Sequence, residues 1–289
     1  MRPDFAAFIL SHGRADKVRT YDALRRHGYT GKIYIIIDDQ DASGDEYRKR
    51  YGDQVVTFSK AEAAKTFDIG DNLSKMNSVV YARNVCHDIA KSLGLRYFIE
   101  LDDDYNNFRF AFDANRCPKH ITCTHLDDVI DAMLQFYKSI DATTIAMAQG
   151  GDFIGGPQGQ HVISARRKVM NSFICSVERP FKFSGRMNDD VNTYVTLGRR
   201  GALFLTIMQF SLTQAMTQIS SGGLTEMYLE LGTYVKSFYT VMYEPSCTVI
   251  SELGDHRSPH YRIHHDINWD RAVPKIIRES HQKPRGGMR

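Results

Sequence analysis

The sequence predicts an α/β fold in which a mostly parallel sheet is covered by helices on both faces. Two observations predict it. Short apolar runs, the length of buried strands, alternate with longer segments of helical periodicity through the first half of the chain. Polar clusters follow several of these runs. Such alternation is typical of parallel strands joined by helical crossovers, and 289 residues suffice for one large domain of this kind.

The first elements follow one another closely. Residues 5–10 form an apolar run that is too short for a core helix and predict a buried strand. The polar turn SHGR comes next, and residues 15–27 predict an amphipathic helix. Residues 32–37, which contain IYIII, predict a second buried strand that ends in the acidic run of residues 38–41. Residues 55–58 predict a third, short strand.

The clearest helix in the sequence covers residues 73–93, where apolar side chains recur at three- and four-residue steps. Gly94 is suited to end it. Residues 96–101, RYFIEL, predict a fourth strand. Three aspartates follow at the carboxyl end of this strand: Asp102, Asp103 and Asp104.

The rest of the chain is less regular. Residues 127–140 predict an amphipathic helix and residues 143–148 the next strand. Residues 202–210 are strand-like, and residues 225–239 can form a helix. We see no repeat and no clear linker, so we expect one domain. Its expected parts are a regular half over residues 1–149, a second half over residues 150–275 and a disordered polar tail over residues 276–289.

Composition excludes several classes of protein and leaves others open. A net charge of +3 is compatible with a nucleic-acid partner but too small to argue for one. The five cysteines are odd in number and form no CxxC pair, so they indicate neither a disulfide framework nor a zinc site. The short apolar run near the N-terminus does not fit a signal peptide, and no segment has the length of a membrane span. We therefore expect a soluble, cytoplasmic protein without a membrane partner.

Three polar clusters fall at the carboxyl ends of predicted strands, at residues 11–14, 38–41 and 102–104. Open parallel sheets bind ligands at this edge, so the co-location predicts a nucleotide site. Adjacent carboxylates repel one another unless a cation compensates them. Their oxygens suit Mg²⁺ or Mn²⁺, which can bridge a diphosphate. A solvated turn or a helix cap is the alternative for any single cluster.

The stretch NSVVYARNVCHDIAKSLGLRYFIELDDDY resembles the core of GT-A glycosyltransferases, in which a helix carrying ARN precedes a strand that ends in a DxD motif. The segment from FILSHGR to IYIIIDDQD resembles the first βαβ unit of the same Rossmann-like fold. More narrowly, SHGR, the ARN helix, ELDDDY and a later NDD resemble the TET/JBP-associated glycosyltransferases. These are bacteriophage and eukaryotic relatives linked to sugar modification of hydroxymethylated pyrimidines in DNA.

This resemblance implies a GT-A-like fold and a hexosyltransferase that uses a UDP-sugar, such as UDP-glucose, with Mn²⁺ or Mg²⁺. The acceptor it implies is 5-hydroxymethylcytosine or 5-hydroxymethyluracil in DNA. Residues 1–149 would then bind the nucleotide sugar, and residues 150–275 would bind the acceptor. The implied nucleotide-sugar site comprises Ser11, His12, Arg14, Asp38, Asp39, Arg83, Asp102 and Asp103. The implied metal ligands are Asp102, Asp104 and His256.

Two further sets of residues complete the predicted site. Asp189 and Asp190 of MNDDVNTYV stand at a predicted helix start, where the general base of an inverting GT-A enzyme lies. We favour Asp190 as the base, because Asp189 is nearer the helix start and more easily used in capping. A basic group could track a DNA backbone: Arg166, Arg167 and Lys168.

Other functions stay open at this point. The acceptor could be a saccharide or a protein. A metal-dependent nucleotidyltransferase would use the same strand-end carboxylates, but it needs a glycine-rich phosphate loop, and SHGR supplies one glycine. A catalytically inactive nucleic-acid-binding module is a third alternative. Asp102 and Asp104 weigh against it, because their mutual repulsion would destabilise the protein without a metal to compensate it.

Overall fold

The computed structural model describes residues 1–74, 76–113, 118–153, 171–214, 224, 227–228, 231–232, 234–253 and 261–272. The strands of its main sheet are β1 (Phe5–Leu10), β2 (Lys32–Asp38), β3 (Val55–Phe58), β4 (Tyr97–Asp102), β5 (Tyr105–Phe112), β6 (Pro118–Thr122), β7 (Thr144–Ala148), β8 (Ser172–Ser176) and β9 (Phe204–Gln214). A separate hairpin joins β10 (Thr248–Leu253) to β11 (Arg262–Ile267). The helices of four residues or more with an α conformation are α1 (Arg19–Arg26), α2 (Gly44–Tyr51), α3 (Lys60–Ala64), α4 (Val80–Ser92), α5 (Leu126–Ser139), α7 (Asp189–Arg199), α9 (Val235–Tyr243) and α10 (Trp269–Ala272).

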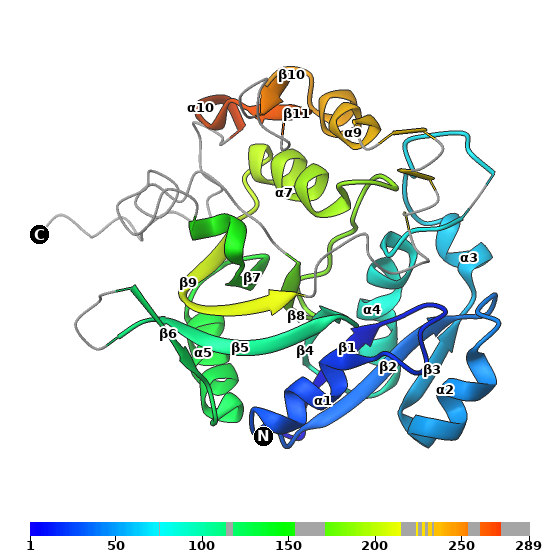
Figure 1. Cartoon of the computed structure of the whole chain (residues 1–289), viewed down its shortest axis with the longest axis vertical. Coiled ribbons are helices and arrows are strands. Elements are labelled where there is room, and N and C mark those ends of the chain that lie inside the picture. Colours follow the sequence, from blue (N-terminus) through cyan, green and yellow to red (C-terminus); the bar gives the residue numbers. More distant parts are fainter. Residues whose placement is uncertain are drawn as a thin grey trace, which may run out of the picture.

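The main sheet has the strand order β3-β2-β1-β4-β8-β7-β9-β5-β6 (Figure 1). The pairs β2–β3, β1–β2, β1–β4 and β7–β9 are parallel. The strands β5 and β8 run against the others, because each pairs antiparallel with its neighbours. The predicted α/β class with a mostly parallel sheet is confirmed, and one antiparallel strand comes from each half of the sequence.

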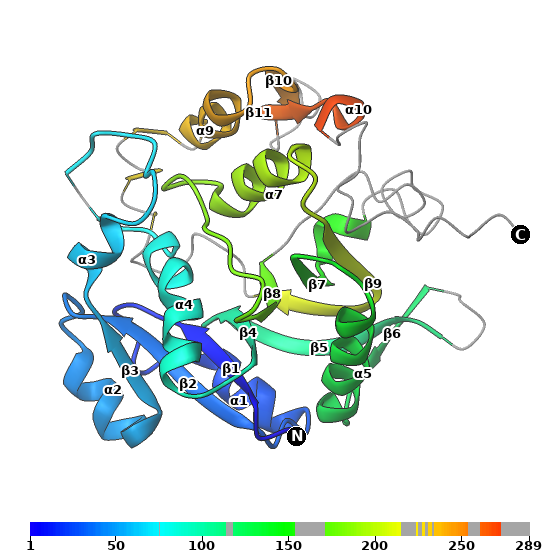
Figure 2. The same cartoon turned by 180° about the vertical axis from the view of Figure 1, so that it is seen from behind.

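Side chains alternate between the two faces of the sheet, as the pleat requires. In β1, Phe5 and Ile9 pack into the core that contains Leu24 of α1 and Leu134 of α5. Phe8, between them, packs into the opposite core. That second core also contains Val80 and Cys86 of α4 and Val195 of α7. Helices therefore cover both faces, with α1 in front of the sheet in Figure 1 and α4 in front in Figure 2.

The elements α7, α9, α10 and the β10–β11 hairpin gather at one end of the molecule, opposite the N-terminus (Figures 1 and 2). Their contacts explain the grouping. Tyr194 of α7 stacks on Trp269 of α10, with ring centroids 6.0 Å apart. The amide of Asn188, just before α7, donates to the backbone oxygen of Lys236 in α9 at 2.8 Å. This group of elements stands above the carboxyl ends of the parallel strands.

Two predicted helices begin later in the structure than their apolar patterns suggest. The helix predicted over residues 73–93 begins at Val80. The segment before it is held in a loop, since Arg186 binds the backbone oxygen of Leu73 and Ser78 binds that of Arg186. The helix predicted from residue 15 begins at Arg19. The residues before it form a turn, in which the backbone N–H of Lys17 donates to the backbone oxygen of Arg14. Thr20, in the first turn of the helix, binds the backbone of Asp102 and Asp103.

The helix predicted over residues 225–239 is wrong in its bounds. Gly232 has a φ of +84°, which a right-handed helix does not allow, and α9 begins beyond it at Val235. None of the helices in the described ranges is both long enough and apolar enough to cross a membrane. The expected tail over residues 276–289 lies outside the described residues.

Candidate active site

The first and third polar clusters meet at the carboxyl ends of β1 and β4. The buried carboxylate of Asp103 accepts hydrogen bonds from Ser11 Oγ at 2.6 Å and from Arg14 Nη1 at 3.1 Å. Burial raises the pKa of Asp103, and these two donors oppose the rise. Ser11 Oγ also lies 2.6 Å from the hydroxyl of Tyr47 in α2. Asp103 thus holds the SHGR turn in place, while the Arg14 side chain stays about a quarter exposed.

The second cluster joins the first through His12. The Nδ1 atom of His12 lies 2.6 Å from Asp38 Oδ2, and Lys60 Nζ lies 3.0 Å from the other oxygen of Asp38. Burial alone would raise the pKa of Asp38, but the hydrogen bonds from His12 and Lys60 hold it below its usual value. Asp41 accepts from the backbone N–H of Gly13 at 2.7 Å. Asp39, which is exposed, accepts from the backbone N–H of Lys60.

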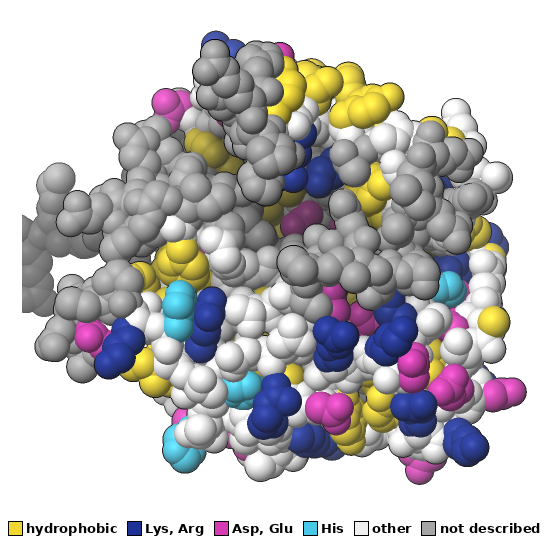
Figure 3. Space-filling model, viewed as in Figure 1, with side chains coloured by type: hydrophobic (Ala, Val, Ile, Leu, Met, Phe, Trp, Pro, Cys, Tyr) yellow, Lys and Arg dark blue, Asp and Glu magenta, His cyan; other side chains and the backbone are white. Residues whose placement is uncertain are grey.

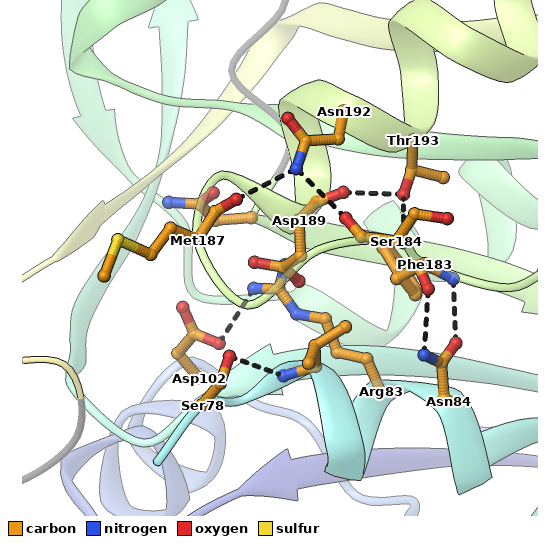
Figure 4. A network of polar contacts seen from close by, with 12 residues as sticks. Ser78, Arg83, Asn84, Asp102, Phe183, Ser184, Met187, Asp189, Asn192 and Thr193 are labelled. Atoms are coloured by element: carbon orange, nitrogen blue, oxygen red, sulfur yellow. Dashed lines mark hydrogen bonds and ion pairs between the residues drawn. The ribbon is translucent and has the colours of Figure 1, made fainter. Parts of the chain in front are cut away.

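Arg83 connects the end of β4 to the start of α7, as Figure 4 shows. Its Nη2 atom lies 3.3 Å from Asp102 Oδ1, and its Nη1 atom donates to Asp189 Oδ2 at 2.8 Å. The guanidinium is buried between the rings of Phe173 and Phe183, 5.2 and 5.5 Å from their centroids. A buried arginine therefore compensates the carboxylates in this structure, whereas the sequence argument considered only a metal. The predicted contact of Arg83 with a nucleotide stays a prediction.

The two aspartates of the NDD motif differ in their surroundings. Asp189 is buried and is held by Arg83, not by capping as the sequence argument supposed. The N-cap is Asn188, whose side chain caps nothing and whose φ is +52°. Asp190 is partly exposed. Burial and the charge of Asp189 raise its pKa to about 7. A carboxyl group with a pKa near neutrality is suited to accept a proton during catalysis.

Asp104 lies in the tight turn between β4 and β5. Its Oδ2 atom accepts from Gln214 of β9 at 3.2 Å, and its Oδ1 atom is buried without a hydrogen-bond partner in the described part of the chain. Burial and the charge of Asp102 raise its pKa to about 6. An orphaned carboxylate oxygen beside a second carboxylate fits a divalent cation. Residues 1–74, 76–113 and the other described ranges contain no group of three or more His, Cys, Asp or Glu that could hold a metal, and His256 lies outside them.

The residues predicted to contact DNA are mostly not tested by the structure. Arg166, Arg167 and Lys168 lie outside the described residues. Two aromatic residues of β5, Tyr105 and Phe108, are completely buried in the core, so they are not available to stack on a base.

Sequence reasoning missed the contribution of α9 and β11 to the site. Lys236 of α9 lies close enough to Asp190 for their charges to interact. In β11, His265 Nδ1 lies 3.4 Å from the Asn188 amide. In this part of the chain the sequence predicted only His256 as a site residue. Lys236 has no motif around it that would separate it from an ordinary surface lysine.

Comparisons with known proteins agree with the resemblance found in the sequence. The family model of TET-associated glycosyltransferases matches residues 5–223. No curated protein matches the chain. Among solved structures, glucosyl-3-phosphoglycerate synthase from Mycobacterium tuberculosis, in complex with Mn²⁺, uridine diphosphate and phosphoglyceric acid, gives a TM-score of 0.45 at 9% identity over 91% of this chain and 86% of that one. S. aureus TarS 1–349 gives 0.44 at 7% identity over 82% of this chain and 65% of that one.

These structural similarities are too weak to carry an argument about function, whereas the family match is extensive. It begins at the first residue of β1 and continues past the end of β9. It includes every strand of the main sheet and all the residues of the SHGR, ARN, DDD and NDD motifs. The chain therefore belongs to the TET-associated glycosyltransferase family.

Proposed function

We propose that this glycosyltransferase moves a sugar from a UDP-sugar to the hydroxymethyl group of a modified pyrimidine in DNA, 5-hydroxymethylcytosine or 5-hydroxymethyluracil. One observation carries the proposal. The Asp189–Arg83–Asp102 chain brings the start of α7, with Asp190, to the strand end that carries the DDD motif. Arg83 and Asp189 are 106 residues apart in the sequence. These contacts support a site in which Asp190 would serve as the base beside the strand end that would bind the donor.

The donor would lie along the carboxyl ends of β1, β2 and β4. The fixed SHGR turn would present Arg14 to the diphosphate, since this guanidinium is partly exposed although one of its nitrogens binds Asp103. His12, whose side chain is 45% exposed, and Asp39 would contact the uridine. The two loops support each other through the His12–Asp38 and Gly13–Asp41 contacts. The nucleotide would thus bind to a preformed edge.

Asp102 and Asp104 would hold a divalent metal, and the orphaned Oδ1 atom of Asp104 is the feature that fits one. When bound, Mn²⁺ or Mg²⁺ would neutralise charge on the leaving diphosphate. Both carboxyl groups must be ionised to bind it. Asp102 makes the longer of the two ion pairs of Arg83, at 3.3 Å against 2.8 Å for Asp189.

Asp190 would act as the general base. Its carboxylate takes the proton of the acceptor hydroxymethyl group while the freed oxygen bonds to the anomeric carbon of the sugar. The bond from that carbon to the phosphate oxygen breaks, and its electron pair leaves with UDP. The anomeric configuration is inverted. Asp189 is held by Arg83 beside Asp190, and burial together with the charge of Asp189 raises the pKa of Asp190 to about 7.

The choice of DNA as acceptor rests on the family. The TET-associated relatives that the sequence resembles are linked to hydroxymethylated pyrimidines in DNA, and the mildly basic chain is compatible with this partner. A base inside a duplex cannot reach Asp190, so the target nucleotide would be extruded into the site. Arg166, Arg167 and Lys168 are candidates for contacts with the DNA backbone.

The test is a transfer assay. The protein is incubated with a panel of UDP-sugars, Mn²⁺ and duplexes that contain 5-hydroxymethylcytosine, 5-hydroxymethyluracil or unmodified pyrimidines, and the digested nucleosides are weighed by mass spectrometry. We expect one hexose on one hydroxymethylated nucleoside, and loss of the product on chelation of the metal. Transfer only to free saccharides or to protein, with the same donor, would overturn the DNA acceptor.

A further inference from the structure

We propose that Lys236 of α9 and Arg262 of β11 form a phosphate-binding subsite on the acceptor side of the candidate active site. The inference deepens the proposed function and rests on it for the identity of the ligand. Two phosphates are possible occupants. One is a phosphodiester of the acceptor nucleic acid next to the target nucleotide, and the other is the diphosphate of the donor.

The two residues come from elements that pack against each other and against the start of α7. The Asn188 amide donates to the backbone oxygen of Lys236 at 2.8 Å. Ser237, the next residue of α9, lies with its Oγ 3.4 Å from the backbone oxygen of Ile263, the residue after Arg262. Lys236 and Arg262 are thus neighbours across the α9–β11 contact, and both adjoin the residue that precedes Asp189 and Asp190.

Lys236 differs from the other shielded cations of this region. Arg83, Arg186 and Lys60 each have an aspartate within 3.0 Å. The half-buried ammonium of Lys236 lies over the ring of Tyr228, 5.9 Å from its centroid. Within the described ranges, no carboxylate lies within ion-pair distance of this ammonium and no hydrogen bond uses it.

The charges around Lys236 favour an anion. Burial and the charge of Arg262 disfavour the ammonium and lower its pKa, while the charge of Asp190 acts in the opposite direction. Two cations therefore lie close together, and a bound anion would relieve their repulsion. In Figure 3, basic side chains lie beside an acidic one at the level of α7, recessed below the hydrophobic side chains over α9 and β10.

A phosphate group satisfies this pair better than a carboxylate would. It offers several acceptor oxygens, so a guanidinium and an ammonium can bind it together. Phosphate contacts fix the register of a nucleic acid without reading its sequence. A phosphodiester held at Lys236 and Arg262 would therefore position the neighbouring nucleotide, whose hydroxymethyl group must reach Asp190. Phosphate binding here would set how the acceptor enters the site rather than which base is modified.

The experiment compares Lys236→Gln and Arg262→Gln with a matched control, Arg199→Gln. Arg199 is also a cation near α9, but it lies at the far end of α7 and binds Glu244 at 2.7 Å. Affinity for a fluorescent, unmodified duplex is measured by anisotropy at several salt concentrations. Affinity for UDP is measured by calorimetry, and kcat and KM are measured with the hydroxymethylated duplex.

If the phosphate belongs to the nucleic acid, each test variant weakens duplex binding and raises its KM by about tenfold, with kcat and UDP affinity unchanged. The slope of log affinity against log salt falls by about one. If the phosphate belongs to the donor, UDP affinity falls instead. Lys236→Arg keeps the charge and restores wild-type values in either case, which a loss of folding would not allow.

The proposal is overturned if both test variants bind duplex and UDP as Arg199→Gln does. The binding measurements use unmodified DNA and UDP alone, so they remain informative if no sugar transfer to DNA is found. A failure of the proposed function and a failure of the phosphate subsite are therefore separate results.

Discussion

Arg83 shows how a single side chain can organise two carboxylates that would otherwise repel one another. Its guanidinium is buried, and it binds Asp102 from one side and Asp189 from the other. The rings of Phe173 and Phe183 shield it from water. Because a buried charge without a partner is costly, Asp102 and Asp189 cannot move away freely. The end of β4 and the start of α7 are thus joined through one residue.

The pKa of Asp190 leads to a prediction for the pH dependence of catalysis. A general base must be deprotonated, and burial next to Asp189 raises the pKa of Asp190 to about 7. We therefore expect kcat to fall as pH decreases through about 7. Asp190→Asn should lower kcat by about 10² to 10⁴ and leave donor affinity unchanged, because it removes the base but keeps the shape. Single-turnover rates between pH 5 and pH 9 test this.

Asp189→Asn is the matched control. It should affect kcat mildly but lower the free energy of unfolding, since Arg83 loses the charge of its closer partner. Near wild-type rates for both variants would eliminate the assignment of the base. NMR of the anomeric proton in the product provides a second check, because retention of the donor configuration would eliminate the inverting mechanism itself.

At the scale of elements, the position of α7 depends on α9. Asn188 adopts the left-handed conformation immediately before α7, and its amide binds the backbone of α9. Asn192, one turn into α7, accepts from Thr240 of α9 at 2.9 Å. Arg186, just before this junction, binds Asp71 through two nitrogens, and Tyr239 of α9 binds the same carboxylate. The start of α7 is therefore held from three directions.

A pair of substitutions at Asn188 separates its backbone role from its side-chain role. Asn188→Gly and Asn188→Ala both lose the hydrogen bond to α9. Alanine also pays about 1–2 kcal/mol for the left-handed conformation, whereas glycine loses about 0.4–1 kcal/mol through the freedom of the unfolded chain. We expect the alanine variant to be less stable than the glycine variant in urea unfolding. The reverse order would show that the φ of +52° is not maintained in solution.

The elements that could be predicted from sequence are those with a regular local pattern. The strands β1, β2 and β4 are continuous apolar runs, and α5 has a clear apolar stripe. The strand β8 was not predicted. It is buried, but its sequence SFICS contains two serines, and Ser172 satisfies its hydroxyl through a tertiary contact, as acceptor from the backbone N–H of Met147. A partner so distant in sequence leaves no local signal.

The candidate site likewise has residues with a local sequence signal and residues that depend on distant contacts. The clusters at the ends of β1, β2 and β4 could be found because parallel strands end at one edge. The pairing of Arg83 with Asp189 could not, because it joins residues 106 positions apart. The placement of Lys236 near β11 depends on the packing of α9 against β11, which no periodicity in either segment predicts.

At the scale of the whole molecule, the sheet interleaves strands from both parts of the sequence. The strands β8 and β9, which follow residue 149, lie among β4, β7 and β5, which precede it. The two parts therefore share one sheet. The strands β8 and β9 pair only with strands of the first part, and β7 pairs only with β8 and β9 of the second part. Cooperative unfolding follows from this arrangement, and the protonation of one buried group affects the stability of the whole molecule.

His87 is such a group. It lies in α4, 4% exposed, with its ring edge-to-face against Phe98 at 5.0 Å and Phe181 at 5.5 Å. Its Nε2 atom has no hydrogen-bond partner among the residues that the structure describes. Burial, aided by the charge of Lys182, lowers its pKa from 6.5 to about 4. The folded protein thus keeps His87 neutral in a range of pH where the unfolded chain protonates it.

The sign of the resulting pH dependence follows directly. Between pH 6.5 and pH 4 the unfolded state binds more protons at His87 than the folded state does, so the free energy of unfolding decreases as the pH falls. The slope of the free energy of unfolding against pH is up to about 1.4 kcal/mol per pH unit.

In the His87→Leu variant the side chain is apolar and cannot titrate, so this contribution to the pH dependence should be lost. Urea unfolding of both proteins at several pH values between 7 and 4 measures it, with His120→Gln, an exposed position on β6, as the control. We expect the control to follow the wild type and the His87→Leu variant to show a shallower slope. Equal slopes of unfolding free energy against pH for all three proteins would mean that His87 is protonated in the folded state. The packing of Phe98 and Phe181 around it would then admit water under these conditions.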